Sequence, residues 1–341
     1  MKIYHLSHTD LDGYGAQYIT NFYFKDVKFL NSNYGREIDD KFAQILSEID
    51  ASNDDKNVIL ITDLNLTPAQ CESFEEMIDG KNIKLFLLDH HQSGAECASA
   101  YSWYFLDSSR CATKITYDFF AGIFGKNKEL EIFSDVVNAV DIWLKDDKNF
   151  EMGKVCLGLV ANAKEINKVM FETENNLYMD HILKEASKFF NEKNDYIGLD
   201  MQVHAIKKSF FKEDKDDTLS NLISNYVVKK LSENKEKFSI NYKDHKGILT
   251  YNVGNVSVIG NDFLVANPEF DFFIDVTNKK TLSFRANGKL DVSAMAKHLV
   301  GGGGHVNASG GLFANFKDGF SYEPIKAQIV DLITKKTQEE I

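Results

Sequence analysis

Residues 85–91 read Leu85-Phe86-Leu87-Leu88-Asp89-His90-His91, an apolar run that ends abruptly in an acid and two histidines. A short apolar run of this kind is typical of a strand that is buried on both faces of a parallel sheet. Two similar runs, Ile3–Leu6 and Val58–Thr62, precede it, and segments of helical period over 38–49 and 68–78 separate the three. This alternation predicts an α/β domain built on a doubly wound, mostly parallel sheet.

The remaining chain predicts a second, different domain. A length of 341 residues is about twice the usual domain size. The pattern is mostly helical from 111 to about 190, and the Lys- and Glu-rich residues 191–238 predict linker helices. We therefore predict an N-terminal α/β domain over 1–190, a helical linker over 191–238 and a smaller α+β domain over 239–341. The strands expected in the last domain are Gly247–Val253, Val256–Ile259, Phe270–Val276 and Thr281–Ala286, and its expected helix is Val292–Val300.

Composition restricts the class of protein. Hydrophobic residues make up 43% of the chain, enough for ordinary globular cores, and no apolar run approaches the roughly 20 residues that span a bilayer. The N-terminus turns polar too early for a secretory signal, so we expect a cytoplasmic protein without a membrane partner. The net charge of −12 would repel duplex DNA but allows a small phosphorylated ligand. The cysteines lack metal-ligand spacing and are expected to be buried thiols: Cys71, Cys97, Cys111 and Cys156.

Acids and histidines follow each predicted strand. His8, Asp10 and Asp12 come after the first strand, Asp63 after the second, and Asp89-His90-His91 after the third. The carboxyl ends of the strands form the ligand crevice in an open α/β sheet, so three strands would deliver these side chains to one place. A single Asp after a strand is usually a turn residue or a cap, but that interpretation weakens as the set grows.

A fourth acid, Asp141, lies in a helical segment whose neighbouring face is apolar. An ionised carboxylate there needs a partner, and a metal ion is one. A buried Asp that is hydrogen-bonded to a neighbouring helix fits the segment equally well, and Asp135 and Asn138 are alternative inward residues. Two imidazoles and four carboxylates suit Mn²⁺ or another borderline or hard divalent ion. Two ions about 3.5 to 4 Å apart would use the whole set for in-line attack on phosphorus.

The second domain contains the run Gly301-Gly302-Gly303-Gly304-His305. Glycines let backbone N–H groups approach an anion, although a flexible loop is a nearly equal interpretation of the run alone. Ser283 and Arg285 stand nearby on a predicted strand, and a guanidinium matches phosphate geometry, so an anion site is the better interpretation. A P-loop is excluded because no Gly-Lys-Ser/Thr ending follows.

Taken together, these motifs resemble the DHH phosphoesterase family with its DHH-associated C-terminal domain. The resemblance runs in order from residue 7 to residue 311, across both predicted domains. Within the family, the chain is most similar to the oligoribonuclease (nanoRNase) and phosphoadenosine phosphatase type. One spacing differs, since Asp10 follows His8 by two residues where many members have four.

The resemblance implies roles for the individual residues. Asp89 would orient the adjacent histidines, and His91 would contact the scissile phosphate or its leaving oxygen. Arg285, His305 and the glycine run would clamp a substrate phosphate. Two Mn²⁺ ions would share Asp63 as a bridge. The ligands of the first ion would be His8, Asp10 and Asp63, and those of the second Asp12, Asp63, His90 and Asp141.

The resemblance also implies an activity. The protein would be a Mn²⁺-dependent phosphodiesterase that shortens nanoRNA and pApA-type dinucleotides to mononucleotides, as a monomer or a homodimer. Its partners would be short single-stranded oligonucleotides or dinucleotides. The alternatives are a 5′–3′ single-strand exonuclease, a phosphoadenosine phosphate phosphatase and a pyrophosphatase. A nucleotide-sensing module without turnover is disfavoured, because every position of the pattern is filled.

Overall fold

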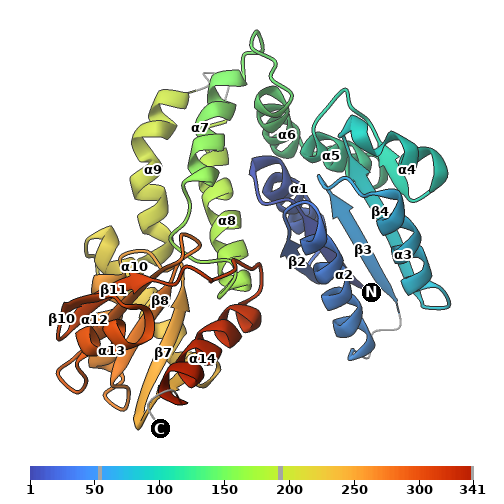
Figure 1. Ribbon diagram of the computed structural model, residues 1–341. Coiled ribbons are helices and arrows are strands. Elements are labelled where there is room, and N and C mark those ends of the chain that lie inside the picture. Colours follow the sequence, from blue (N-terminus) through green and yellow to red (C-terminus); the bar gives the residue numbers. More distant parts are fainter. Residues whose placement is uncertain (53–55, 191–194, 339–341) are drawn as a thin grey trace. The chain divides into compact units, whose positions relative to one another are not determined.

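The computed structural model describes residues 1–52, 56–190 and 195–338 (Figure 1). The chain divides into two compact units, each formed by two stretches of sequence. The first unit consists of Met1–Ala163 and Asn176–Ile206, and the second of Lys164–Asn175 and Lys207–Ile341.

The predicted linker, 191–238, has described residues in both units, because the boundary at 206 falls inside helix α9 (Tyr196–Phe211). The stretch 164–175, predicted to belong to the N-terminal domain, is part of the second unit.

The first unit is built on a five-stranded sheet in which all neighbouring strands are parallel. The strand order is β2-β1-β3-β4-β5, so the order reverses between β1 and β3. Ligands bind at such a reversal in open α/β sheets. The three predicted strands and the parallel α/β class are confirmed. The strands are β1 (Lys2–Ser7), β2 (Val27–Asn31), β3 (Asn57–Thr62), β4 (Ile83–Asp89) and β5 (Tyr104–Leu106).

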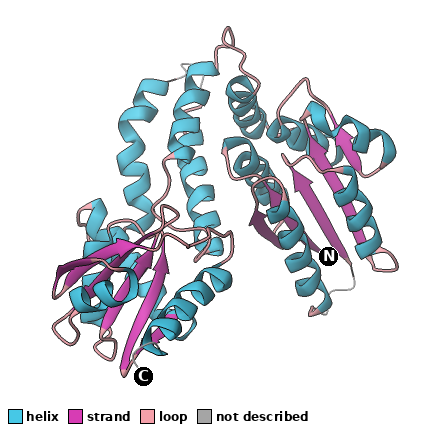
Figure 2. Cartoon of the chain, in the orientation of Figure 1, coloured by secondary structure: helices cyan, strands magenta, loops and turns pink. Residues whose placement is uncertain are grey.

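Helices alternate with the strands of the first unit (Figure 2). Thr67 starts α3 with a capping box, in which its hydroxyl accepts from the Gln70 N–H and Pro68 occupies the first turn. In the core, the rings of Phe42 in α2 and Phe74 in α3 stack with centroids 3.7 Å apart. The helices are α1 (Leu11–Tyr23), α2 (Arg36–Asp50), α3 (Pro68–Ile78), α4 (Ala95–Ala100), α5 (Ala112–Phe124), α6 (Lys128–Asp141), α7 (Phe150–Ala161) and most of α8 (Glu172–Ser187), which begins in the second unit.

The second unit contains a six-stranded mixed sheet in the order β10-β11-β9-β8-β7-β6. Only the β7–β8 pair is parallel among the described pairs of this sheet. The predicted α+β class is confirmed. The strands are β6 (Ser239–Tyr242), β7 (His245–Tyr251), β8 (Phe272–Val276), β9 (Thr281–Ala286), β10 (Gly303–His305) and β11 (Ala308–Leu312). The helices are α10 (Leu219–Glu233), α11 (Lys235–Phe238), α12 (Val256–Ala266), α13 (Val292–Val300) and α14 (Tyr322–Gln338).

One predicted strand is wrong, because Val256–Ile259 forms the first turn of α12. Over four residues, the branched side chains imitate the alternation of a strand. The buried positions of the whole segment instead follow helical spacing, with Ile259, Phe263 and Leu264 facing the core. Asn255 has a φ of 50° immediately before the helix, which turns the chain after β7.

The glycine run is not a flexible loop, which was the alternative to the predicted anion site. Gly303–His305 is strand β10 and pairs antiparallel with β11. Gly304 has a φ of 150°, and a Cβ there would lie 2.6 Å from the carbonyl oxygen of Ala308, so only glycine fits this pairing. The run therefore forms one side of a β-hairpin at the edge of the sheet.

All four cysteines are free and buried, as predicted. Among the described residues, no helix has both the length and the apolar character needed to cross a membrane.

Candidate active site

The acids and histidines of the first unit meet at the carboxyl edge of its parallel sheet. Ser7 of β1 is in register with Thr62 of β3, and Thr62 with Leu88 of β4. The residues that follow these strands therefore begin at the same level. Asp63 continues the alignment, because its N–H donates to the carbonyl of Leu88 at 3.2 Å.

The start of α1 contributes two carboxylates. Asp10 caps the helix by accepting from the Gly13 N–H at 3.0 Å. The Asp12 side chain is buried and accepts from the N–H groups of Ala112 and Thr113, each at 2.7 Å, at the start of α5. Unsatisfied N–H groups at a helix start stabilise an ionised carboxylate. Asp12 is therefore held in a fixed orientation at the start of α5.

One group of possible ligands consists of His8, Asp10 and Asp63. The His8 Nδ1 lies 2.9 Å from Asp10 Oδ2 and 3.7 Å from Asp63 Oδ2. Burial opposes the charged imidazole, but the two carboxylates outweigh it and raise the pKa of His8 to about 10. Burial likewise opposes the Asp10 charge, but the His8 hydrogen bond outweighs it and lowers the pKa of Asp10 to about 2. His8 and Asp10 therefore form an ion pair.

A second set of contacts centres on His90. Its Nε2 lies 3.3 Å from Asp63 Oδ1, 3.6 Å from Asp141 Oδ2 and 3.7 Å from Asp12 Oδ2. Burial, and then the charge of Asp12, raise the pKa of Asp141 to about 8 and hold that of Asp63 well above its usual range. The carboxylates disfavour one another's ionisation, so the cluster needs positive charge for all of them to ionise.

Asp63 belongs to both sets. Its backbone has a φ of 55°, a left-handed conformation that costs free energy in a residue other than glycine and that clusters at functional sites. The side chain is 2% exposed, and its Oδ2 has no hydrogen-bond partner among the described residues. A buried carboxylate oxygen without a donor suits a divalent cation, so the donor set fits the expected metal.

His91, which follows β4, has different contacts from His90. Its Nδ1 lies 2.7 Å from Asp89 Oδ1, while Asp89 Oδ2 accepts from the Tyr104 hydroxyl at 2.9 Å. Asp89 is fully buried and only accepts, so His91 Nδ1 carries the proton of this bond. The hydrogen bond to Asp89 raises the pKa of His91, and the other ring nitrogen, Nε2, is not part of that bond.

Comparison with known proteins identifies the family, although no family model matches the chain. The chain is 41% identical over 343 residues to a 3′,5′-cyclic-nucleotide phosphodiesterase of Helicobacter pylori (strain ATCC 700392 / 26695), and the match covers 97% of this chain and 99% of that protein. The chain belongs to the family of that enzyme. It is a phosphoesterase, as predicted.

A solved structure supports the same family. An uncharacterized protein from Helicobacter pylori G27 has 40% identity to the phosphoesterase and a TM-score of 0.92. That comparison covers 98% of this chain and 99% of the other. The narrower oligoribonuclease or phosphoadenosine phosphatase type stays a prediction.

In α6 of the phosphoesterase, three polar residues are candidates for the inward position, and they have different partners. Asp141, the last residue of the helix, reaches the His90 cluster. Asp135 instead pairs with the Lys114 ammonium at 2.6 Å, and the Asn138 side chain accepts from the backbone N–H of Cys111 at 2.8 Å. Of the three, only Asp141 is placed to share a cation with the other acids.

Sequence reasoning missed two residues at this site. The Cys111 thiol forms a third group of possible ligands with Asp12 and Asp141, all within 4.8 Å of one another. The Tyr34 hydroxyl lies 3.0 Å from His91 Nε2. No spacing in the sequence indicates either contact, because each joins segments at least 30 residues apart. The only sequence feature that could have indicated them is their place beside an element. Cys111 immediately precedes α5, and Tyr34 follows β2.

The candidate phosphate residues of the second unit lie on adjacent strands. Ser283 and Arg285 of β9 are in register with Gly310 and Ala308 of β11, which pairs with the glycine strand β10. The Arg285 guanidinium donates to the Ser257 hydroxyl at 2.7 Å and to the Phe284 carbonyl at 2.7 Å. His305 is exposed. The structure thus brings the arginine strand and the glycine hairpin together within one sheet.

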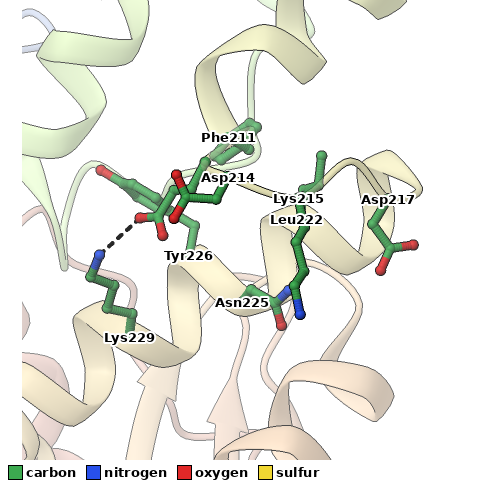
Figure 3. Close-up of a pocket in the computed structure, with 9 residues that line it drawn as sticks. Phe211, Asp214, Lys215, Asp217, Leu222, Asn225, Tyr226 and Lys229 are labelled. Atoms are coloured by element: carbon green, nitrogen blue, oxygen red, sulfur yellow. Dashed lines mark hydrogen bonds and ion pairs between the residues drawn. The ribbon is translucent and has the colours of Figure 1, made fainter.

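A separate cavity of about 310 Å³ lies in the second unit, beside the end of α9 and along α10 (Figure 3). The Lys229 ammonium and Glu213 form an ion pair at 2.8 Å on its wall. Its described lining includes none of the residues that the sequence analysis selects. The cavity is therefore not part of the predicted site.

Proposed function

We propose that this phosphoesterase is a Mn²⁺-dependent phosphodiesterase that hydrolyses small nucleotides by two-metal in-line attack. The observation that carries the proposal is the position of Asp63, a buried carboxylate shared by two adjacent groups of Asp and His ligands. The name of the Helicobacter relative supports 3′,5′-cyclic nucleotides as the first substrates to test. A location in the cytoplasm stays a prediction.

The metal-binding roles follow from the two sets of contacts. His8, Asp10 and Asp63 would hold one ion, and the second would be held by Asp63 together with the remaining members of the His90 cluster. When bound, two such ions would supply an activated water and neutralise the charge that develops on the phosphate. A mixture of imidazole and carboxylate donors is compatible with manganese. The ligands of the second ion are Asp12, Asp63, His90 and Asp141.

His91 has a role of its own. Asp89 holds its Nδ1–H, so the ring presents Nε2 at a fixed orientation beside the ligand cluster. A protonated Nε2 can donate to a phosphate oxygen or deliver a proton to the leaving oxygen. Because Asp89 keeps the protonated imidazole stable, His91 is suited to this work near neutral pH.

Short linear oligonucleotides of the nanoRNA and pApA type are a second class of substrate. Arg285 and the glycine hairpin of the second unit support it, because guanidinium and backbone N–H groups recognise a further phosphate. A net charge of −12 would repel each additional phosphate of a long strand. We therefore place a processive exonuclease below a short-substrate enzyme.

The test is a product time course with the Mn²⁺-loaded protein. The substrates are 3′,5′-cyclic AMP and GMP, pApA, phosphoadenosine phosphate, inorganic pyrophosphate and a labelled 20-mer. We expect mononucleotides from the cyclic nucleotides, from pApA or from both, and slow or no hydrolysis of the 20-mer. Absence of turnover on every nucleotide diester, with metal bound, would overturn the proposal.

A further inference from the structure

Tyr34 stands beside the two histidines that have different proposed roles. It lies in the segment between β2 and α2, outside every predicted element. Its hydroxyl is 3.0 Å from His91 Nε2, and its ring centroid is 4.7 Å from that of His8 at a tilt of 38°. The side chain is nevertheless 44% exposed. A large aromatic ring therefore borders the charged cluster with part of its surface free.

The hydroxyl of Tyr34 is a neutral donor. Burial, and then the charges of Asp63 and Asp10, raise the pKa of the phenol above its ordinary value. This hydroxyl is hydrogen-bonded to Nε2 of His91, while the Nδ1–H of the same ring donates to Asp89. Tyr34 thus occupies the nitrogen that we propose faces the phosphate. A bound phosphate would take over this nitrogen and leave the hydroxyl free to donate to a neighbouring phosphate oxygen.

The ring offers a surface of a different kind. Its contact with His8 supports one part of the ring, and its edge faces His91 with the two ring planes at 78°. An exposed aromatic ring beside a phosphate site is suited to a flat base or to a ribose, since base–aromatic stacking does not depend on sequence. Carboxylates and imidazoles alone could not distinguish a nucleotide from inorganic phosphate.

We propose that Tyr34 is a substrate-binding residue whose exposed ring packs against the nucleoside and whose hydroxyl donates to a phosphate oxygen beside His91. The proposal rests on the proposed function, because it assumes that a nucleotide phosphate binds at the ligand cluster. It adds the means by which the site recognises the rest of the nucleotide.

Calorimetric titration of the Mn²⁺-loaded protein separates the two parts of Tyr34. The ligands are 5′-AMP and inorganic phosphate, and the variants are Tyr34→Phe and Tyr34→Ala. Both variants should bind phosphate more weakly by the same small factor, about 3-fold, because both lack the hydroxyl. Tyr34→Ala should lower the affinity for AMP by about a further 10-fold or more, because it alone lacks the ring. Tyr196→Ala, which removes another exposed tyrosine at the start of α9, is the control and should change neither affinity.

Three results would overturn the proposal. Equal AMP affinities for Tyr34→Phe and Tyr34→Ala would show that the ring does not hold the nucleoside. An equal loss of AMP and phosphate affinity in Tyr34→Ala would show the same. Loss of Mn²⁺ from Tyr34→Ala, measured by mass spectrometry, would make the ring a support for His8 instead. Turnover by the wild-type protein is measured in a separate assay. A failure of the proposed function is therefore distinguishable from a failure of the proposed role of Tyr34.

Discussion

Asp63 in the first unit and Asp275 in the second are both buried aspartates whose Oδ2 has no hydrogen-bond partner among the described residues. Burial raises the pKa of both carboxyls. Their neighbours are different. Asp275 accepts from the Thr250 hydroxyl at 2.8 Å and from the Val253 N–H at 3.1 Å, both on Oδ1, whereas Asp63 lies between two histidines and near other acids.

The difference shows that an unsatisfied buried oxygen does not by itself indicate a ligand site. Asp275 can be stabilised by retaining its proton, because no other carboxylate contributes to its raised pKa. At Asp63 the charge of Asp12 adds to burial, and His8 and His90 approach from separate strand ends. Convergence of several charged groups, together with left-handed backbone at the strand end, is what favours a cation at Asp63.

Substitution of Asp63 should have the most severe effect on the site. Asp63→Ala takes a ligand from both groups, so we expect loss of both bound Mn²⁺ equivalents and a fall in turnover on the order of 10³-fold or more. Metal content by mass spectrometry and turnover are measured together. Asp50→Ala, which removes an exposed acid paired with Lys81, should leave both unchanged. Retention of two ions by Asp63→Ala would contradict the bridging role.

The adjacent histidines, His90 and His91, should respond differently to substitution. His91→Ala should keep its metal and lose turnover by a factor on the order of 10², typical of a positioned acid. His90→Ala should lose metal, because its Nε2 faces three carboxylates. The two variants are compared by metal analysis under identical loading. If His91→Ala is the metal-free variant, His91 is a ligand, as its membership of a group with Asp63 and His90 allows.

Arg285 tests whether the second unit contributes to catalysis. Arg285→Lys keeps the charge but loses the fork that contacts Ser257 and the Phe284 carbonyl, so kcat/KM for pApA should fall about 10-fold. Arg110→Lys, at an arginine that pairs with Asp107 in the first unit, is the matched control. A silent Arg285→Lys, with 20-mers degraded as fast as dinucleotides, would favour the exonuclease alternative.

Much of the fold and the positions of the strand-end acids could be predicted from the sequence. Buried parallel strands leave continuous apolar runs, and their register forces the residues after β1, β3 and β4 to one edge. The edge strand β2 was missed because its first three residues are only half-buried and include Lys28, so it has no apolar run. Since Tyr34 follows β2, its contact with His91 could not be predicted either.

Other features depend on contacts that leave no local pattern. Asp12 is fixed by backbone N–H groups about 100 residues away, at the start of α5. Cys111, which begins that helix, comes within reach of Asp12 and Asp141 through the same packing. In the second unit, the glycine run forms a strand because β11 pairs with it, although glycine itself disfavours strands.

Asp275→Asn should leave turnover unchanged. Its effect should appear instead in the pH dependence of the free energy of unfolding. Burial raises the pKa of Asp275 to about 7 in the folded protein. Between the ordinary pKa of an aspartate and about pH 7, the folded state therefore retains a proton that the unfolded state has lost. This contribution to the free energy of unfolding is complete below the pKa of Asp275 in the unfolded state. It disappears as the pH rises through about 7.

Urea unfolding of the wild-type and Asp275→Asn proteins between about pH 5 and pH 8 measures this contribution. The free energy of unfolding of the wild-type protein should fall relative to the variant by about 3 kcal/mol over this range, at about 1.4 kcal/mol per pH unit up to pH 7. The amide of the variant cannot ionise, so it removes this slope. Asp271→Asn is the control, because that carboxylate is partly exposed and pairs with His245 and Lys289. Parallel curves for wild type and Asp275→Asn would show that Asp275 ionises normally. The contrast between an aspartate that retains its proton and Asp63 would then be lost.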